Sequence, residues 1–215
     1  MTSGTAAGKP SGMREGPPGA ILVIVSGPSG VGKDTVIEAL RRLPTSAGQH
    51  YVVTCTTRPP RAYEVDGVHY HFLSPAAFKR LRADGGLLEA NEVHGNWYGT
   101  PRGEVQDALA RGADVILKID VQGAAAVKGK VPEALLVFIV PPSLEDLFGR
   151  LQSRATETAD EVDIRQRDAV LELAQADHFD YVVTNETGQV ERTADRVEAI
   201  IRAEKAAHPD RRLRV

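Results

Sequence analysis

Short apolar runs recur along the chain, and stretches with helical spacing separate most of them. Runs of this kind are typical of buried strands, and they lie at residues 20–25, Tyr51–Thr57, Asp114–Asp120, Ala134–Val140 and Tyr181–Thr184. Apolar residues three and four positions apart predict amphipathic helices; the first carries Val36, Ile37, Leu40 and Leu43, and others cover Pro75–Ala83, Gly103–Ala110, Leu144–Arg154, Asp160–Ala176 and Val190–Ala207. This alternation predicts an α/β fold, a parallel sheet with helices on both faces.

A glycine-rich loop joins the first predicted strand to its helix and reads Ser26-Gly-Pro-Ser-Gly-Val-Gly-Lys33. Gly27, Gly30 and Gly32 can adopt backbone angles closed to other residues, so consecutive N–H groups can turn toward phosphate oxygens. Lys33 adds a positive charge, and the N-terminus of the following helix adds a partial one. Because ligands of parallel sheets bind at the carboxyl ends of the strands, we expect a nucleotide polyphosphate at this loop.

The last position of this loop departs from its usual form, G-x-x-x-x-G-K-[ST], whose final hydroxyl contacts Mg²⁺. Asp34 stands there in this chain, and Thr35 follows it. Asp34 either ligates the metal with its carboxylate or stabilises the helix N-terminus while Thr35 or water serves the metal. The sequence leaves both interpretations open.

Two arginine-bearing stretches lie beyond the loop. Arg58 and Arg61 follow a predicted strand end, and paired planar donors of this kind can bind a second phosphate. Arg150 and Arg154 are four residues apart on one predicted helix face, and Arg165 follows. Taken singly, these residues fit a solvated basic turn and ordinary surface charge, but together with the loop they favour transfer between two phosphorylated molecules.

Length, composition and charge narrow the class of protein. The 215 residues suit one compact unit, with any second domain as an insertion. A hydrophobic fraction of 42% and a net charge of −3 are ordinary for a soluble protein and argue against nucleic acid as the main partner. Cys55 is the only cysteine, which excludes an intrachain disulfide, predicts a small buried side chain and fits a reducing cytoplasm. Residues 1–18, rich in Gly, Ser and Pro, are interpreted as a flexible tail without a membrane span.

Nine short motifs resemble those of the guanylate kinases, in the order of that family. Besides the glycine-rich loop they are Thr56-Thr-Arg-Pro-Pro-Arg61, Glu64-Val-Asp-Gly67, Tyr70-His-Phe72, Gly95-Asn-Trp-Tyr-Gly-Thr100, Ile119-Asp-Val-Gln-Gly123, Pro141-Pro-Ser143, Arg154-Ala-Thr-Glu-Thr158 and Val183-Thr-Asn185. The resemblance covers roughly Ala20 to Lys205. It implies an ATP:GMP phosphotransferase of the P-loop nucleoside monophosphate kinase fold. Its core would comprise residues 19–53, 104–142 and 168–207, with a GMP-binding insertion at 54–103 and a lid at 143–167.

The resemblance also implies roles for individual residues. ATP would contact the loop at Gly27, Ser29, Gly30, Val31, Gly32, Lys33, Asp34 and Thr35, and its adenine would contact Asn185. The GMP phosphate would be held by Arg58, Arg61, Tyr70 and Tyr98, and the guanine would be recognised by Thr54, Glu89 and Thr100. Lys33, Arg150, Arg154 and Arg165 would act on the transferred phosphoryl group. Mg²⁺ would be organised by Asp34, Thr35 and Asp120, directly or through water.

Lys118 is a second departure, because many family members carry an acidic residue near the guanine at that position. A lysine cannot accept a hydrogen bond, so guanine recognition would be changed if it points into the acceptor pocket; otherwise its stem packs on the strand and its charge reaches water or a carboxylate. Two alternatives to guanylate kinase activity stay open, and Lys118 bears on the second. One is a non-catalytic guanylate-kinase-like binding module, and the other is a nucleoside monophosphate kinase with a different acceptor.

Overall fold

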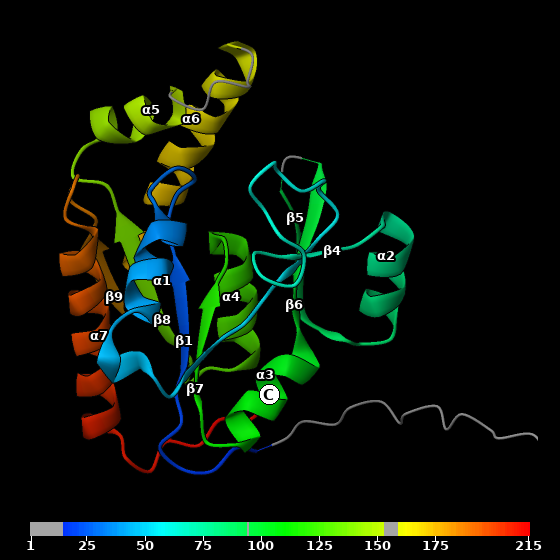
Figure 1. Ribbon diagram of the computed structural model, residues 1–215, viewed down its shortest axis with the longest axis vertical. Helices are drawn as coiled ribbons and strands as arrows, with labels where there is room; N and C mark the ends of the chain where they lie inside the picture. Colours follow the sequence, from blue (N-terminus) through cyan, green and yellow to red (C-terminus); the bar gives the residue numbers. More distant parts are fainter. Residues whose placement is uncertain (1–14, 94, 153–158) are drawn as a thin grey trace, which may run out of the picture.

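A computed structural model describes residues 15–93, 95–152 and 159–215, and these contain a central five-stranded sheet. The strand order is β2-β7-β1-β8-β9, and every neighbouring pair in it is parallel, as the sequence predicts (Figure 1). The strands are β1 (Leu22–Ser26), β2 (Gln49–Tyr51), β7 (Asp114–Lys118), β8 (Leu135–Val140) and β9 (Tyr181–Thr184).

Helices cover both faces of this sheet because successive side chains of its strands point to opposite sides. On β1, Val23 and Val25 belong to the core that includes α1 (Lys33–Arg41) and α7 (Val190–Ala207). Leu22 and Ile24 belong to the opposite core, which includes α3 (Arg102–Ala110) and α4 (Val121–Lys130). The layered α/β architecture therefore matches the prediction, although helix α4 was not predicted.

A second sheet lies beside the core, with the order β4-β3-β6-β5 (Figure 1). Its elements are β3 (Cys55–Thr56), β4 (His71–Phe72), α2 (Pro75–Ala83), β5 (Leu87–Val93) and β6 (Asn96–Pro101). The prediction of one strand at Tyr51–Thr57 was wrong, because β2 and β3 belong to different sheets. Cys55 is buried as expected, and burial raises the pKa of its thiol to about 11.

Two helices at one end of the molecule lie near the glycine-rich loop, at the top of Figure 1. They are α5 (Leu144–Gln152) and α6 (Ala159–Leu173), and short 3-10 turns occur at Pro44–Ser46 and Ala176–His178. Helix α6 ends three residues before the predicted Ala176, and the predicted end of the preceding helix, Arg154, lies outside the described residues. No helix among the described residues has the length and apolar character needed to cross a membrane.

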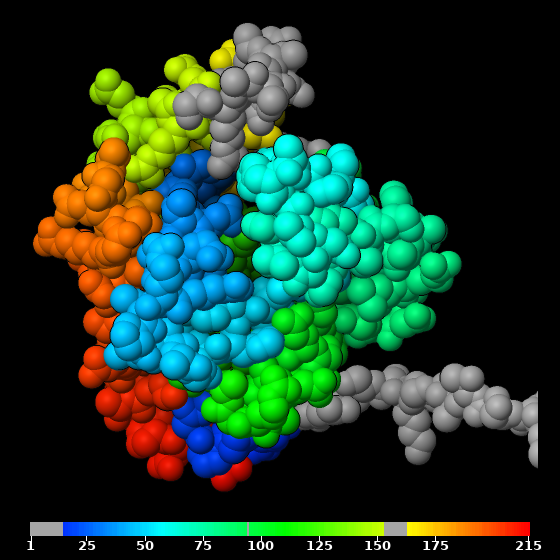
Figure 2. All heavy atoms as spheres, in the orientation of Figure 1, coloured from blue at the N-terminus to red at the C-terminus, as the bar shows by residue number. Residues whose placement is uncertain are grey.

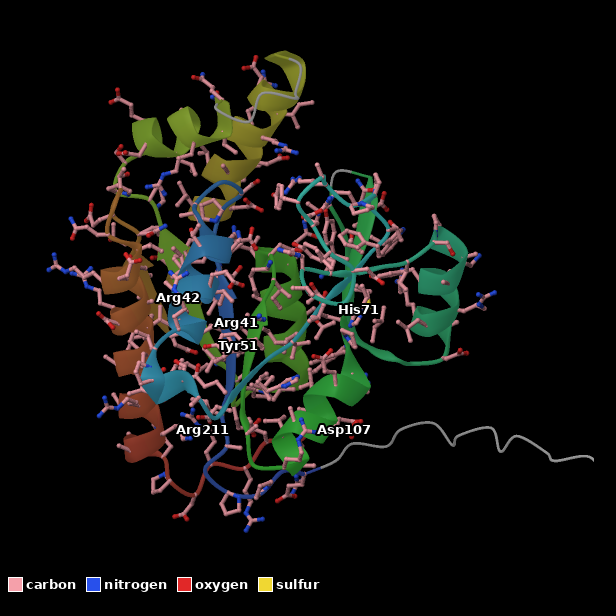
Figure 3. All side chains as sticks on the ribbon, in the orientation of Figure 1. Arg41, Arg42, Tyr51, His71, Asp107 and Arg211 are labelled. Atoms are coloured by element: carbon pink, nitrogen blue, oxygen red, sulfur yellow. The ribbon has the colours of Figure 1, made fainter. Side chains whose placement is uncertain are left out.

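A cleft separates the core from the second sheet. Figure 2 shows it as a hollow between the blue surface of the glycine-rich loop and α1 and the cyan surface of residues beyond 50. The guanidinium of Arg41, on α1, lies 4.7 Å from the centre of the ring of Tyr51, on β2, and this contact joins the two elements (Figure 3). The glycine-rich loop and the predicted acceptor residues meet at this cleft.

Candidate active site

The glycine-rich loop has the backbone conformation that its sequence predicts. Gly27, Gly30 and Gly32 all have positive φ angles, of 145°, 83° and 95°. A Cβ atom on Gly27 would lie 2.3 Å from the Ile139 carbonyl oxygen on β8, so a larger residue would push the loop from the sheet. Helix α1 begins at Lys33, directly after Gly32, which directs its N-terminus toward the loop.

Lys33 lies against this loop. Its Nζ donates hydrogen bonds to the carbonyl oxygens of Gly27, at 2.5 Å, and Pro28, at 3.0 Å. Burial lowers the pKa of Lys33, and the nearby carboxylates of Glu172, Asp34 and Asp120 act against that shift. The ammonium group is therefore positioned in the loop where polyphosphate oxygens would collect.

Glu172, on α6, was not predicted as a site residue. Its Oε2 accepts a hydrogen bond of 2.9 Å from the Ser29 backbone N–H, one of the loop amides predicted to hold phosphate. Burial raises the pKa of Glu172, while the Ser29 amide and Lys33 act to lower it. The Glu172 carboxylate thus binds a backbone amide that is predicted to hold a phosphate oxygen.

Two predicted site residues, Asn185 and Arg150, contact the backbone of the loop. The Asn185 side-chain amide donates to the Val31 carbonyl oxygen at 2.8 Å, and Arg150 donates to the same oxygen at 3.0 Å. Arg150 also donates to the Thr187 hydroxyl at 2.8 Å. In this conformation both side chains brace the loop backbone, and their predicted contacts with adenine and with the transferred phosphoryl group stay predictions.

One cavity joins the phosphate loop to the predicted acceptor site. Of the predicted residues, it is lined by Ser29, Lys33, Asp34, Thr54, Arg61, Tyr70, Glu89, Tyr98, Asp120 and Arg165, and Lys118 and Glu172 also line it. Arg154, predicted to join this group, lies outside the described residues. The cavity therefore places groups suited to two phosphates and to a base within a single site.

The predicted acceptor-phosphate residues gather around the Tyr70 ring. The Arg58 guanidinium lies 5.5 Å from the centre of that ring, and the Tyr98 ring lies 6.0 Å from it. Glu64 holds Arg58 through two hydrogen bonds, of 2.9 and 2.8 Å, and accepts another from the Arg61 backbone N–H. Hydrogen bonding to Glu64 raises the pKa of Arg58, which stays positively charged. The role of Glu64 was not predicted, although it lies in one of the quoted motifs.

The residues predicted to recognise guanine form a buried polar group on the β5–β6 hairpin. The Thr100 hydroxyl donates to Glu89 Oε1 at 2.6 Å, and the Asn91 side chain donates to Glu89 Oε2 at 2.8 Å. Glu89 is only 4% exposed, and burial raises its pKa to about 7. Thr54 is also buried and lines the same cavity. Asn91 was not predicted as part of this group.

Asp34 and Lys118, the two departures noted in the sequence, contact each other. Lys118 Nζ donates a hydrogen bond to Asp34 Oδ1, and the two groups form an ion pair. Thr35 donates its hydroxyl to the Gly32 carbonyl oxygen at 2.7 Å. Asp120 caps α4 by accepting a hydrogen bond of 2.8 Å from the Gly123 N–H. Lys118 thus lines the cavity and reaches a carboxylate, and its effect on guanine recognition stays a prediction.

The fold and this site define a P-loop nucleotide-binding protein with a second binding region beside the loop. Comparison with known proteins narrows the class further, because residues 20–204 match the guanylate kinase family. The chain is 46% identical over 189 residues to a guanylate kinase of Symbiobacterium thermophilum, covering 88% of each chain. It is 47% identical to one of Gloeobacter violaceus, covering 89% of this chain and 90% of that one.

A solved structure agrees with these sequence matches. The crystal structure of guanylate kinase from Anaplasma phagocytophilum superimposes with a TM-score of 0.71 at 31% identity, covering 88% of both chains. The chain belongs to the guanylate kinase family.

Proposed function

We propose that this protein is an ATP-dependent guanylate kinase that transfers the γ-phosphoryl group of ATP to GMP, and to dGMP, giving ADP and the nucleoside diphosphate. The observation that carries the proposal is the single cavity shared by Lys33 of the phosphate loop and by Arg61, Tyr70 and Glu89 of the acceptor region. A donor and an acceptor phosphate bound there would lie next to each other, as direct transfer requires. The buried, high-pKa thiol of Cys55 fits a reducing cytoplasm as the compartment.

On the donor side, the loop amides and Lys33 would bind the β- and γ-phosphates of ATP. The Glu172 carboxylate must leave the Ser29 amide before a phosphate oxygen can take its place. Arg165 lines the cavity, and we assign it, with Arg150 and Arg154, to the charge that spreads over the transferred group.

On the acceptor side, Arg58, Arg61, Tyr70 and Tyr98 would hold the GMP phosphate, and Glu89 would recognise the base. Each Glu89 oxygen already accepts one hydrogen bond and has a second lone pair for guanine N1–H or the 2-amino group. Adenine offers no matching donors at those positions, so the arrangement favours guanine. Thr54 and Thr100 complete this part of the site.

A divalent cation fits the donor set near Lys33. Mg²⁺ prefers oxygen ligands and usually combines one or two carboxylates with substrate phosphates and water. Asp34 and Asp120 line the cavity beside Lys33, and no group of three metal-binding side chains occurs among the described residues, so the phosphates would complete the shell. When bound, the ion would neutralise charge on the phosphates, with Asp120 and then Asp34 or Thr35 as the residues that hold it.

The chemistry is a direct displacement. An oxygen of the GMP phosphate forms a bond to the γ-phosphorus as the bond from that phosphorus to the β-bridging oxygen breaks, and ADP leaves. The attacking oxygen is already an anion near neutral pH, so the site needs no strong general base. Orientation, cation placement and exclusion of water by closure of the cleft supply the catalysis.

A coupled ADP-release assay with ATP and each of GMP, dGMP, AMP, CMP and UMP tests this proposal. We expect GMP and dGMP to be the preferred acceptors, and Lys33→Met to lose most turnover while keeping its melting temperature. Preference for AMP or a pyrimidine nucleotide would indicate a kinase of altered acceptor choice. Binding of GMP without turnover would indicate a non-catalytic module.

A further inference from the structure

The ion pair between Asp34 and Lys118 links two positions that are 84 residues apart in the sequence. Each residue departs from the usual pattern by its charge, and the two charges are opposite. The Asp34 side chain is 72% exposed, whereas that of Lys118 is 21% exposed. A pair with one open partner contributes little to stability, so stability alone gives no reason for a lysine at this position.

The position of Lys118 suggests a different reason. Lys118 ends β7 and pairs in register with Val25 of β1, directly before the phosphate loop. Its Nζ also lies 4.9 Å from the centre of the Tyr70 ring. Arg58 approaches that ring as well, at 5.5 Å. The ammonium group therefore belongs with the predicted acceptor-phosphate residues.

Glu89, in contrast, is hydrogen-bonded by Asn91 and Thr100 on the hairpin. These contacts hold Glu89, the predicted guanine acceptor, in place without a second acid at position 118. The ammonium group beside Tyr70 is suited to binding an anion. It cannot accept a hydrogen bond, so it cannot bind the two hydrogen-bond donors that guanine presents to Glu89.

We propose that Lys118 is an additional binding residue for the phosphate of the acceptor nucleotide, and that Asp34 positions it before the nucleotide binds. The inference rests on the proposed function. A phosphate monoester carries close to two negative charges and three acceptor oxygens, so it can replace one exposed carboxylate as the partner of Lys118. The lysine thereby adds an electrostatic contact on the phosphate at a position where an acidic residue would serve the base.

Comparing GMP with guanosine separates these two roles, because guanosine keeps the base and lacks the phosphate. The dissociation constant of GMP and the inhibition constant of guanosine against GMP would be measured for the wild type, Lys118→Met and Asp34→Ser. Lys128→Met is the matched control, since Lys128 pairs with Asp180 away from the cavity. Melting temperatures would verify folding.

Lys118→Met should weaken GMP binding about tenfold, as expected for a lost hydrogen bond to a charged group, and leave guanosine within about twofold. Asp34→Ser, which keeps the ammonium group, should weaken GMP by less than Lys118→Met does. Equal loss of GMP and guanosine would overturn the proposal by placing Lys118 at the base or in the fold, and unchanged GMP affinity would also overturn it. A wild-type protein that fails to phosphorylate GMP would instead overturn the proposed function.

Discussion

Glu89 and Thr100 face each other across the β5–β6 hairpin, and the Thr100 hydroxyl donates to the Glu89 carboxylate at 2.6 Å. Burial raises the pKa of this carboxyl to about 7, although Thr100 and Asn91 act to lower it. Close to neutral pH the group is therefore divided between its charged and neutral forms. Only the carboxylate can accept hydrogen bonds from both guanine donors.

Guanosine affinity should therefore fall as the pH decreases below 7. With a pKa of about 7 in the free protein, the carboxylate fraction drops about tenfold between pH 8 and pH 6, and affinity should drop by a similar factor. Guanosine is a better probe than GMP here, because the GMP phosphate itself titrates near pH 6. The measurement is the inhibition constant of guanosine from pH 6 to 8, and Glu89→Gln should flatten the profile. A flat wild-type profile would contradict this role for Glu89.

The same carboxyl should make stability depend on pH. Its pKa is about 7 in the folded protein and 4.5 ordinarily, so the folded state holds the proton more tightly. The stability it contributes is complete below pH 4.5 and is lost as the pH rises through 7. The free energy of unfolding of Glu89→Gln, relative to the wild type, should therefore increase by on the order of 2 kcal/mol from pH 5 to pH 8. Urea unfolding at both pH values checks this, and a constant difference would reject it.

Glu172 should compete with ATP for the phosphate loop. Its carboxylate accepts a hydrogen bond from the Ser29 amide and lies near Lys33. Glu172→Gln removes the negative charge, so the KM for ATP should fall by about threefold, with the KM for GMP unchanged. The matched control is Glu191→Gln, which changes an exposed carboxylate paired with Arg42. A rise in the KM for ATP would show that Glu172 supports the loop.

The Mg²⁺ requirement should depend more on Asp120 than on Asp34. Both carboxylates line the cavity beside Lys33, but the Asp34 side chain is 72% exposed, whereas Asp120 is half-buried. Asparagine caps a helix as well as aspartate does, so Asp120→Asn should keep α4 folded and raise the Mg²⁺ midpoint several-fold. Asp34→Ala should leave that midpoint within about twofold. Titration of activity with Mg²⁺ measures both, and the reverse order would assign the metal to Asp34.

The sequence predicts the central sheet and the phosphate loop well because both depend on local patterns. Continuous apolar runs specify strands buried on both faces, and the loop glycines specify their own backbone angles. Helix α4 was not predicted, because its sequence from Val121 to Lys130 is rich in glycine and alanine and has no clear apolar stripe. The run at Tyr51–Thr57 continues across the change from one sheet to the other, so periodicity cannot show the break.

The β5–β6 hairpin was also missed. Strand β5 carries Glu89 and Asn91 among its apolar residues, so it lacks the alternation of a half-buried strand. The buried Glu89 is the reason for that irregular pattern.

Contacts between segments distant in the sequence account for the remaining differences between the predicted and the observed site. Glu172 reaches Ser29 across 143 positions, and no local pattern marks it as a loop contact. Asp34 and Lys118 are each an anomaly in the sequence, and only the fold shows that their charges meet.

The most direct test of this account is the effect of Glu89→Gln on kcat/KM for GMP, measured beside the dissociation constant of ATP. Glutamine places an N–H₂ donor where the guanine donors require an acceptor. Two donors that face each other in a buried site both lack a partner, which costs binding free energy. We predict a loss of about a hundredfold or more in kcat/KM for GMP, with the dissociation constant of ATP unchanged within about twofold. Equal losses for GMP and ATP, or full retention of GMP activity, would contradict the assignment of Glu89 to guanine recognition.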